Sequence, residues 1–314
     1  MSAHAKIFID GQAGTTGLEI TERLAARDDV ELLTIDTEQR KRPETRRECF
    51  ESADVVVLCL PDDAARDAVK LSDTTRFIDA STAHRVHDKW IYGLPELTPI
   101  QRDGIRESRL VSNPGCYATG FVLSIRPLVD ENIISSNALI RTHALSGYSG
   151  GGKQLIEKYS RTADAEQPTR PYALNLSHKH VPEMQHYTGL ELAPFFMPSV
   201  GNFFQGMLVQ TPLFLPEINR SVRPKDLVEI YQNRYANEPF VRVIEAPLQN
   251  ELDEGYLSPT ACNGSNRIDL MVFGHEQQIL VVARLDNLGK GAAGAAVQNL
   301  NLMLGREESA GISA

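Results

Sequence analysis

A glycine-rich turn near the amino terminus constrains the fold of this chain more than any other feature. The turn, Gly11-Gln12-Ala13-Gly14-Thr15-Thr16-Gly17, follows a strand-like run, Lys6–Asp10, and precedes a segment with Leu18, Ile20 and Leu24 at helical spacing. Glycine permits the tight turn and the close backbone approach that this junction needs. The same arrangement holds the pyrophosphate of a dinucleotide at a helix N-terminus. The sequence therefore predicts a nucleotide-binding domain at the start of the chain.

The spacing of this turn, Gly-x-x-Gly-x-x-Gly, differs from the commoner Gly-x-Gly-x-x-Gly. A plain strand-to-helix turn is the alternative, and the strand and helix signals on either side favour nucleotide binding. Further along, Asp36 ends the second strand-like run, where an acid binds the ribose 2′-hydroxyl of NAD. The basic run Gln39-Arg40-Lys41-Arg42 follows and could neutralise the 2′-phosphate of NADP. The residues alone leave the choice of dinucleotide open.

Strand and helix signals alternate through the first third of the chain. The expected strands are Lys6–Asp10, Val30–Asp36, Asp54–Leu60, Arg76–Ala80 and Leu110–Ser112. Asp54–Leu60 is a continuous apolar run after its first residue, as in a strand buried on both faces, and Pro61 opens a helix. This alternation predicts an α/β domain with a Rossmann-type doubly wound parallel sheet.

The pattern changes after residue 116. A helix is expected over Tyr117–Val129, followed by longer strands with fewer helices between them. These strands are Leu139–Ala144, Met207–Thr211, Val241–Ile244, Arg267–Phe273 and Gln278–Arg284. The pattern predicts an α+β substrate and dimerisation domain with a largely antiparallel sheet. We expect residues 1–115 to form the dinucleotide-binding domain, completed by a C-terminal helix at 289–314, and residues 116–288 to form the catalytic domain.

Composition excludes several function classes. A net charge of −9 over 314 residues argues against a nucleic-acid surface, which needs clustered Lys and Arg. No apolar window is long enough for a membrane helix, and the amino terminus does not read as a signal peptide. The four cysteines include no Cys-x-x-Cys pair. We therefore expect reduced thiols and a cytoplasmic protein.

Cys116 is the candidate nucleophile. It follows Asn113-Pro114-Gly115, so the thiol lies on a constrained turn directly before a helix. A helix N-terminus favours the thiolate, which is the reactive form toward an acyl carbon. A lone cysteine is more often structural, but its combination with a dinucleotide site favours catalysis.

The segment His178-Lys179-His180-Val181-Pro182-Glu183 provides candidate acid/base groups. Alternating histidines can also lie at the surface or bind a metal. A zinc site needs further ligands at definite spacing, and one additional histidine, His186, is weak support. We favour catalysis over a metal site, with His180 as the acid/base group and His178 as the alternative.

A second glycine-rich stretch runs from Ser146 to Lys153. Its glycines, hydroxyl groups and lysine suggest a loop that holds an anion before a helix. It is not a P-loop, because Gln154 occupies the position of the required hydroxyl. A flexible hinge is an equally good interpretation of this segment.

Taken together, six segments resemble the N-acetyl-γ-glutamyl-phosphate reductase family, in its shorter second type, within the semialdehyde dehydrogenase superfamily. The segments are Gly11–Gly17, Asp79-Ala80-Ser81, Tyr92-Gly93-Leu94-Pro95-Glu96-Leu97, Asn113-Pro114-Gly115-Cys116-Tyr117, His178–Glu183 and Asp286-Asn287-Leu288-Gly289-Lys290-Gly291-Ala292-Ala293-Gly294. They span nearly the whole chain in order, which makes the resemblance more specific than any single motif.

The resemblance implies NADPH-dependent reduction of N-acetyl-L-glutamyl 5-phosphate to the 5-semialdehyde and phosphate, through a thioester on Cys116, in arginine biosynthesis. It also implies a C-terminal helix packed on the Rossmann domain and a homo-oligomer, either dimer or tetramer. The implied cofactor-binding residues are Gly11, Ala13, Gly14, Thr15, Thr16, Gly17, Ser81 and Asn287, the last near the nicotinamide. The implied substrate-binding residues are Asn113, Arg85, Ser149, His178, Lys179 and Glu183. No metal is expected.

The chain departs from the longer type of this family at two places. This chain has Pro194-Phe195-Phe196-Met197-Pro198 where the longer type has a Pro-His segment. One candidate base is therefore absent, which makes His178 and His180 the stronger candidates for the acid/base group. His84 stands where the longer type has an acid, so Arg85 is the better candidate there. The alternative functions are a related dehydrogenase acting on aspartyl phosphate or carrier-bound aminoadipyl phosphate, or a catalytically silent dinucleotide-binding regulator.

Overall fold

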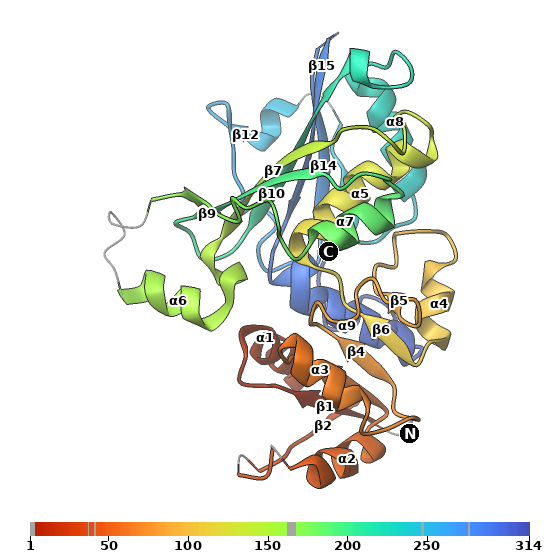
Figure 1. Cartoon of the computed structure of the whole chain (residues 1–314), viewed down its shortest axis with the longest axis vertical. Coiled ribbons are helices and arrows are strands. Elements are labelled where there is room, and N and C mark those ends of the chain that lie inside the picture. Colours follow the sequence, from red (N-terminus) through yellow and green to blue (C-terminus); the bar gives the residue numbers. More distant parts are fainter. Residues whose placement is uncertain (1–3, 37, 41, 162–167, 246–247, 276) are drawn as a thin grey trace. The chain divides into compact units, whose positions relative to one another are not determined.

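The computed structural model describes residues 4–36, 38–40, 42–161, 168–245, 248–275 and 277–314 (Figure 1). Within these residues the chain forms two compact units. The first comprises the chain up to Pro114 together with residues 292–313, and the second comprises residues 115–291. No helix in the described ranges is both long enough and apolar enough to cross a membrane.

The first unit contains a six-stranded sheet in which every pair of neighbouring strands is parallel. Its strands are β1 (Ala5–Asp10), β2 (Val30–Leu33), β3 (Val55–Leu58), β4 (Phe77–Asp79), β5 (Ile91–Tyr92) and β6 (Leu110–Ser112). Their order, β2-β1-β3-β4-β6-β5, puts the first crossover between β1 and β3. The predicted doubly wound parallel sheet is confirmed.

Helices lie on both faces of this sheet (Figure 1). They are α1 (Thr15–Ala25), α2 (Pro43–Ser52), α3 (Asp62–Val69), α4 (Gln101–Glu107) and α9 (Gly294–Met303). Phe8 of β1 packs with Phe50 of α2 and Phe77 of β4 in one buried cluster. On the other side, α1 and α9 contact each other, and α9 also contacts β3 and β4.

Four expected elements of the first unit are shorter than the sequence suggests. Of the expected strands Asp54–Leu60 and Arg76–Ala80, only Val55–Leu58 and Phe77–Asp79 are strands in the structure. The second strand ends at Leu33 rather than Asp36, because its pairing with β1 ends at the Phe8–Leu33 register. The C-terminal helix does not extend over 289–314. One turn of π-helix, Gly289–Ala293, precedes α9, and the residues after Met303 form turns.

The second unit contains a seven-stranded mixed sheet in the order β11-β14-β15-β10-β7-β9-β8. Its strands are β7 (Arg141–Gly147), β8 (Arg170–Pro171), β9 (Phe195–Gly201), β10 (Met207–Phe214), β11 (Val241–Val243), β14 (Ile268–Gly274) and β15 (Gln278–Leu285), and a separate hairpin joins β12 (Leu252–Asp253) to β13 (Tyr256–Leu257). Only β11–β14 and β7–β9 are parallel pairs. The predicted largely antiparallel sheet is therefore confirmed.

The helices of this unit are α5 (Cys116–Asp130), α6 (Gly152–Arg161), α7 (Val181–Thr188) and α8 (Pro224–Tyr235). Short 3-10 turns lie at Tyr148–Gly151, Leu215–Glu217 and Leu248–Glu251. Helices α5 and α8 pack on the sheet, and α7 packs on α5. The strand expected at Leu139–Ala144 instead covers Arg141–Gly147, the residues that pair with Phe195–Gly201 of β9.

A charged network is buried in the same sheet. Asp269 of β14 accepts hydrogen bonds from Arg284, Arg242 and Arg267, and both Asp269 and Arg284 are almost fully buried. Burial alone would raise the pKa of Asp269, but the hydrogen bonds from Arg242 and Arg284 lower it to about 2. This carboxylate therefore stays ionised at neutral pH and holds the arginines in place.

Candidate active site

The glycine turn lies at the first crossover of the parallel sheet, where such sheets bind ligands. Gly11 has a φ of +96°, and a Cβ there would lie 2.3 Å from the carbonyl oxygen of Cys59. A Cβ at Gly17 would lie 2.6 Å from the carbonyl oxygen of Gly11. Gly14 is the N-cap of α1, which has neither a side-chain cap nor an acid in its first turn. These features fit a phosphate-binding helix N-terminus.

The residues that follow β2 form an exposed turn. The carbonyl of Asp36 accepts hydrogen bonds from the amides of Gln39 and Arg40, and Arg42 is the N-cap of α2. Lys41, part of the basic run, lies outside the described residues. The side chains of Asp36, Arg40 and Arg42 are all exposed, so this turn presents an acid together with two cations.

A buried hydrogen-bond network follows β4. Both the amide and the hydroxyl of Ser81 donate to the carboxylate of Asp79, at 2.9 and 2.7 Å. The Nδ1 atom of His84 lies 2.6 Å from the same carboxylate, and its ring stacks on Trp90. The predicted cofactor residue Ser81 is therefore held by an acid. Asp79 also holds His84, the histidine that stands where the longer type has an acid.

Arg85 and Asn113 contact backbone groups of the first unit. Arg85 donates to the carbonyls of Asn113 and Ala80, at 2.9 and 3.2 Å. The side-chain amide of Asn113 donates to the carbonyl of Ala292 and accepts from Asn299. Both residues were expected to bind substrate, and these bonds fix the segment that leads to the cysteine turn.

Cys116 is the first residue of α5 and is half-buried. Its N-cap, Gly115, makes no side-chain cap, and the first turn contains no acid. Gly291 packs directly against it, since a Cβ at Gly291 would lie 2.6 Å from the Cβ of Cys116. The partial positive charge at a helix N-terminus favours the thiolate form of a cysteine in this position.

An aromatic cluster surrounds Tyr117, the residue after the thiol. Its ring centroid lies 5.1 to 5.7 Å from those of Phe196, His178 and His180. The hydroxyl of Tyr172 donates to that of Tyr117 at 2.9 Å. Burial raises the pKa of both tyrosines, and the charge of Cys116 raises it further. The structure thus brings the thiol, two phenol groups and both predicted histidines into one neighbourhood of the second unit.

The two histidines contact each other and differ in exposure. Nδ1 of His178 accepts a hydrogen bond from the backbone amide of His180 at 3.1 Å, and the two rings meet edge to face. His180, the N-cap of α7, is buried, whereas His178 is half-buried and Lys179 is exposed. The alternation of the two histidines therefore places both rings in the cluster and the lysine in solvent.

The stretch from Ser146 to Lys153 forms a 3-10 turn that leads into α6. Ser149 is buried and its hydroxyl accepts a hydrogen bond from the amide nitrogen of Asn287 at 2.9 Å. The oxygen of Asn287 accepts from the amide of Gly206. Lys153 is exposed on α6. The predicted residues Ser149 and Asn287 thus bind each other, and Asn287 ties the stretch to the turn before β10.

Three aromatic residues of this cluster have no role predicted from the sequence, namely Tyr117, Tyr172 and Phe196. Tyr117 follows the thiol directly, and Tyr172 precedes His178 by six residues, so proximity in sequence was the available signal for these two. Phe196 reaches the cluster because β9 pairs with β7, which the sequence does not reveal. Among the described residues, no group of three His, Cys, Asp or Glu side chains is arranged to hold a metal.

Comparison with known proteins identifies the family. Residues 6–105 match the semialdehyde dehydrogenase NAD binding domain, and residues 116–287 match the semialdehyde dehydrogenase dimerisation domain. The chain belongs to the semialdehyde dehydrogenase family. Its NAD binding domain contains the glycine turn, and its dimerisation domain contains Cys116 and both histidines.

Within this semialdehyde dehydrogenase family, the chain is similar to proteins named N-acetyl-gamma-glutamyl-phosphate reductase. It is 48% identical to one from Nostoc, over 98% of this chain and 99% of the relative, and 46% identical to one from Brucella suis, over 96% and 99%. Aspartate semialdehyde dehydrogenase II from Vibrio cholerae shares the fold, with a TM-score of 0.73 at 15% identity over 96% of this chain and 99% of that one.

Proposed function

We propose that this chain is an N-acetyl-γ-glutamyl-phosphate reductase of arginine biosynthesis, which converts N-acetyl-L-glutamyl 5-phosphate to the 5-semialdehyde and phosphate. The observation that carries the proposal is Cys116 at the start of α5, beside a cluster that contains both histidines. The named relatives support the substrate, because they match at 46–48% identity over nearly their whole length.

The proposed reaction begins when the Cys116 thiolate attacks the acyl carbon. A carbon–sulfur bond forms, phosphate leaves with its electron pair, and a thioester remains on the protein. A nicotinamide dinucleotide held at the glycine turn would supply the hydride for reduction of this thioester. His180 protonates the substrate oxygen as charge develops there and takes the proton back when the thiohemiacetal collapses. Collapse releases the semialdehyde and regenerates the thiolate, with His178 as the alternative acid/base group.

For the cofactor we propose NADPH, bound at the glycine turn. Gly11, Gly14 and Gly17, with Ala13, Thr15 and Thr16, form the start of α1 that receives the pyrophosphate. Ser81 and Asn287 remain proposed cofactor contacts. Exposed Arg40 and Arg42 support recognition of a 2′-phosphate. Arg40→Ala with Arg42→Ala should lower kcat/KM for NADPH about tenfold and leave that for NADH unchanged. Equal losses with both cofactors would contradict this assignment.

Substrate binding is proposed for His178, Lys179 and Ser149. Lys179 is an exposed cation beside the two histidines, which suits a phosphate or carboxylate group. Arg85, Asn113 and Glu183 belong to the expected substrate set as well, but their bonds to backbone groups support positioning roles.

The decisive assay runs the reaction in reverse, with semialdehyde, phosphate and NADP. We expect kcat/KM for N-acetylglutamate 5-semialdehyde to exceed that for aspartate semialdehyde by more than about 100-fold, because the site must bind the N-acetyl group and the longer chain. A preference for aspartate semialdehyde would contradict the substrate assignment. An absence of turnover, with NADP still bound, would instead favour a silent regulator.

We propose a homo-oligomer, dimer or tetramer, built on the outer face of the second sheet. Phe195 and Met197 of β9 and Phe214 of β10 are exposed there, on the side that carries His143 and Gln210. Apolar side chains gathered on one strand face favour a protein contact. Met197→Lys should therefore lower the mass measured by light scattering, while an unchanged mass would contradict this face as the interface.

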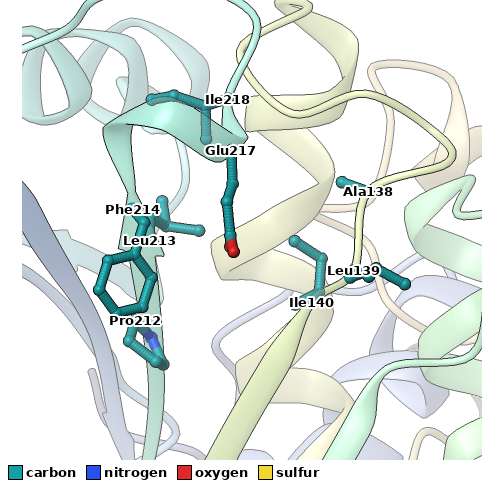
Figure 2. A pocket seen from close by; sticks show the side chains of 8 residues that line it. All are labelled: Ala138, Leu139, Ile140, Pro212, Leu213, Phe214, Glu217 and Ile218. Carbon is teal, nitrogen blue, oxygen red and sulfur yellow. The ribbon is translucent and has the colours of Figure 1, made fainter.

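An apolar pocket of about 180 Å³ adjoins this face, between the start of β7 and the turn after β10 (Figure 2). Leu139 and Phe214 line it, and the carboxylate of Glu217 points into it (Figure 2). Arg141 pairs with Glu217 at 2.8 Å. The pocket suits a side chain of the second copy.

We further propose that the enzyme works in the cytoplasm. All four cysteines are free thiols, which suits a reducing compartment. Fractionation of the producing cell checks this, and recovery of the enzyme outside the cytoplasm would contradict it.

A further inference from the structure

The helix that carries Cys116 begins without a cap of its own. The N-cap residue Gly115 has no side chain, and the first turn of α5 contains no acid. In the usual capping box, an acid at the third position of the same helix accepts a hydrogen bond from the N-cap amide. That third position is Ala118 here, so α5 lacks this local acceptor.

The missing acceptor comes from a different helix. Oε2 of Glu183 accepts a hydrogen bond from the backbone amide of Gly115 at 3.0 Å. Glu183 lies in the first turn of α7 and is 1% exposed. A buried charge–dipole hydrogen bond of this kind is strong, and its partner is costly to leave unsatisfied. The start of α5 is therefore held by a carboxylate 68 residues away in sequence.

This bond joins the two helix starts on which the proposed chemistry depends. His180 is the N-cap of α7, and its carbonyl accepts from the amide of Met184 in the same turn as Glu183. Gly115 directly precedes Cys116. One carboxylate thus links the turn that bears the acid/base group to the turn that bears the nucleophile.

We infer that Glu183 is a positioning residue that sets the Cys116 thiol relative to His180 through the amide of Gly115. The inference rests on the proposed function, since it names what the reductase needs to align. It also implies an electrostatic cost. An anionic carboxylate close to the start of α5 disfavours a second negative charge on the thiol. The hydrogen bond from Gly115 to Glu183 therefore aligns Cys116 with His180, but it lowers the fraction of Cys116 that is ionised.

Two substitutions separate the hydrogen bond from the charge. Glu183→Gln keeps an oxygen acceptor for Gly115 and removes the charge, whereas Glu183→Ala removes both. A matched control is Asp226→Asn, because Asp226 accepts from the N-cap amide of α8 in an ordinary capping box away from the thiol. All variants are made in the full-length protein.

The first measurement is the rate of Cys116 alkylation by iodoacetamide as a function of pH, read by mass spectrometry. In both Glu183 variants we expect the midpoint of the profile to move to lower pH by about 0.5 to 1 unit, because a nearby negative charge has been removed. Asp226→Asn should leave the midpoint unchanged. This readout needs no substrate, so it holds even if the substrate assignment fails.

The second measurement is steady-state kinetics with N-acetylglutamate 5-semialdehyde, phosphate and NADP. Glu183→Ala should lower kcat about 10- to 100-fold with little change in KM, because the reacting groups are misaligned. Glu183→Gln should restore kcat to within about threefold of the unchanged protein, since the acceptor is kept. Dissociation constants for NADP should stay the same.

Several outcomes would overturn the inference. An alkylation profile that is unchanged in both variants would separate Glu183 from the thiol. Equal losses of kcat in Glu183→Gln and Glu183→Ala, with a raised KM for the semialdehyde, would make Glu183 a substrate ligand. If Glu183→Ala does not fold, the pH profile of Cys116 alkylation in Glu183→Gln is the deciding measurement. An unchanged midpoint of that profile would contradict the inference.

Discussion

The glycine turn after β1 and the cysteine turn before α5 look alike locally but are built differently. Each opens a helix that has no side-chain cap and no acid in its first turn. The first turn depends on the missing side chains of Gly11 and Gly17, which are close in sequence. The second depends on Glu183 and Gly291, which are distant in sequence. A turn suited to anion binding can thus be encoded locally, whereas the proposed nucleophile turn requires the folded unit.

The largest expected effect comes from the cysteine turn. Cys116→Ser should lower kcat by at least about 10³-fold, because a hydroxyl at this position is a far weaker nucleophile than a thiolate. The dissociation constant for NADP, measured by titration calorimetry, should not change. Near-normal turnover would contradict the role of the cysteine turn in the reaction. Loss of NADP binding would contradict the prediction that the glycine turn binds the cofactor independently of Cys116.

The matching change in the glycine turn is Gly11→Ala. It forces a side chain into a position with φ of +96° and a 2.3 Å contact, so NADP affinity should fall by about 100-fold and stability by about 1 to 3 kcal/mol. Gly14→Ala is the control, because a Cβ there meets its nearest atom at an ordinary 3.5 Å. The Gly14 variant should melt like the unchanged protein. Alkylation of Cys116 should be unaffected in both, and a change would show that the turns are coupled.

Acid should weaken the second unit through Asp269. Its pKa of about 2 in the folded protein lies below the ordinary value of 3.8, so its stabilising effect is complete above about pH 5 and disappears as the pH falls toward 2. The loss amounts to about 2 kcal/mol. Labelling of buried Cys262 with an aromatic disulfide that also reacts with thiols in acid follows this unit between pH 6 and 3. Fluorescence of the single Trp90 follows the first unit. Equal acid sensitivity of the two probes would contradict the prediction.

The smallest effect concerns the phenol pair. Tyr172→Phe removes the hydrogen bond to the hydroxyl of Tyr117 but keeps the ring, so kcat should fall about three- to tenfold. The raised pKa of both tyrosines keeps them neutral near pH 7. The acidic and basic limbs of the pH–rate profile of Tyr172→Phe should therefore lie at the same pH as in the unchanged protein. A loss above about 100-fold would give Tyr172 a part in proton transfer.

The contrast between the two turns also explains what the sequence could predict. The glycine spacing and the alternation of strands and helices identified the first unit, because each signal lies within a few residues of the next. Cys116 could be identified from the sequence for the same reason, since a Pro-Gly turn before a helix is a local pattern. The position of Cys116 on a turn directly before a helix could therefore be predicted.

The surroundings of that thiol could not be predicted, because they depend on strand order. Phe196 reaches Tyr117 only because β9 lies parallel to β7 in the second sheet. Glu183 was expected to contact substrate, and its bond to Gly115 depends on how α7 packs on α5. Residue type and spacing carry no information about such packing.

The return of the chain to the first unit has a consequence for biosynthesis. Asn299 of α9 donates to the carbonyl of Gly93 and the side chain of Asn113, and Arg76 donates to the carbonyl of Met303. A ribosome therefore delivers the contiguous residues 115–291 before it delivers the helix that completes the first unit. A nascent chain that stalls before Ala292 would contain Cys116 and the whole of residues 115–291, while its first unit would still lack α9. Completion of the first unit is thus a late event in the synthesis of this polypeptide.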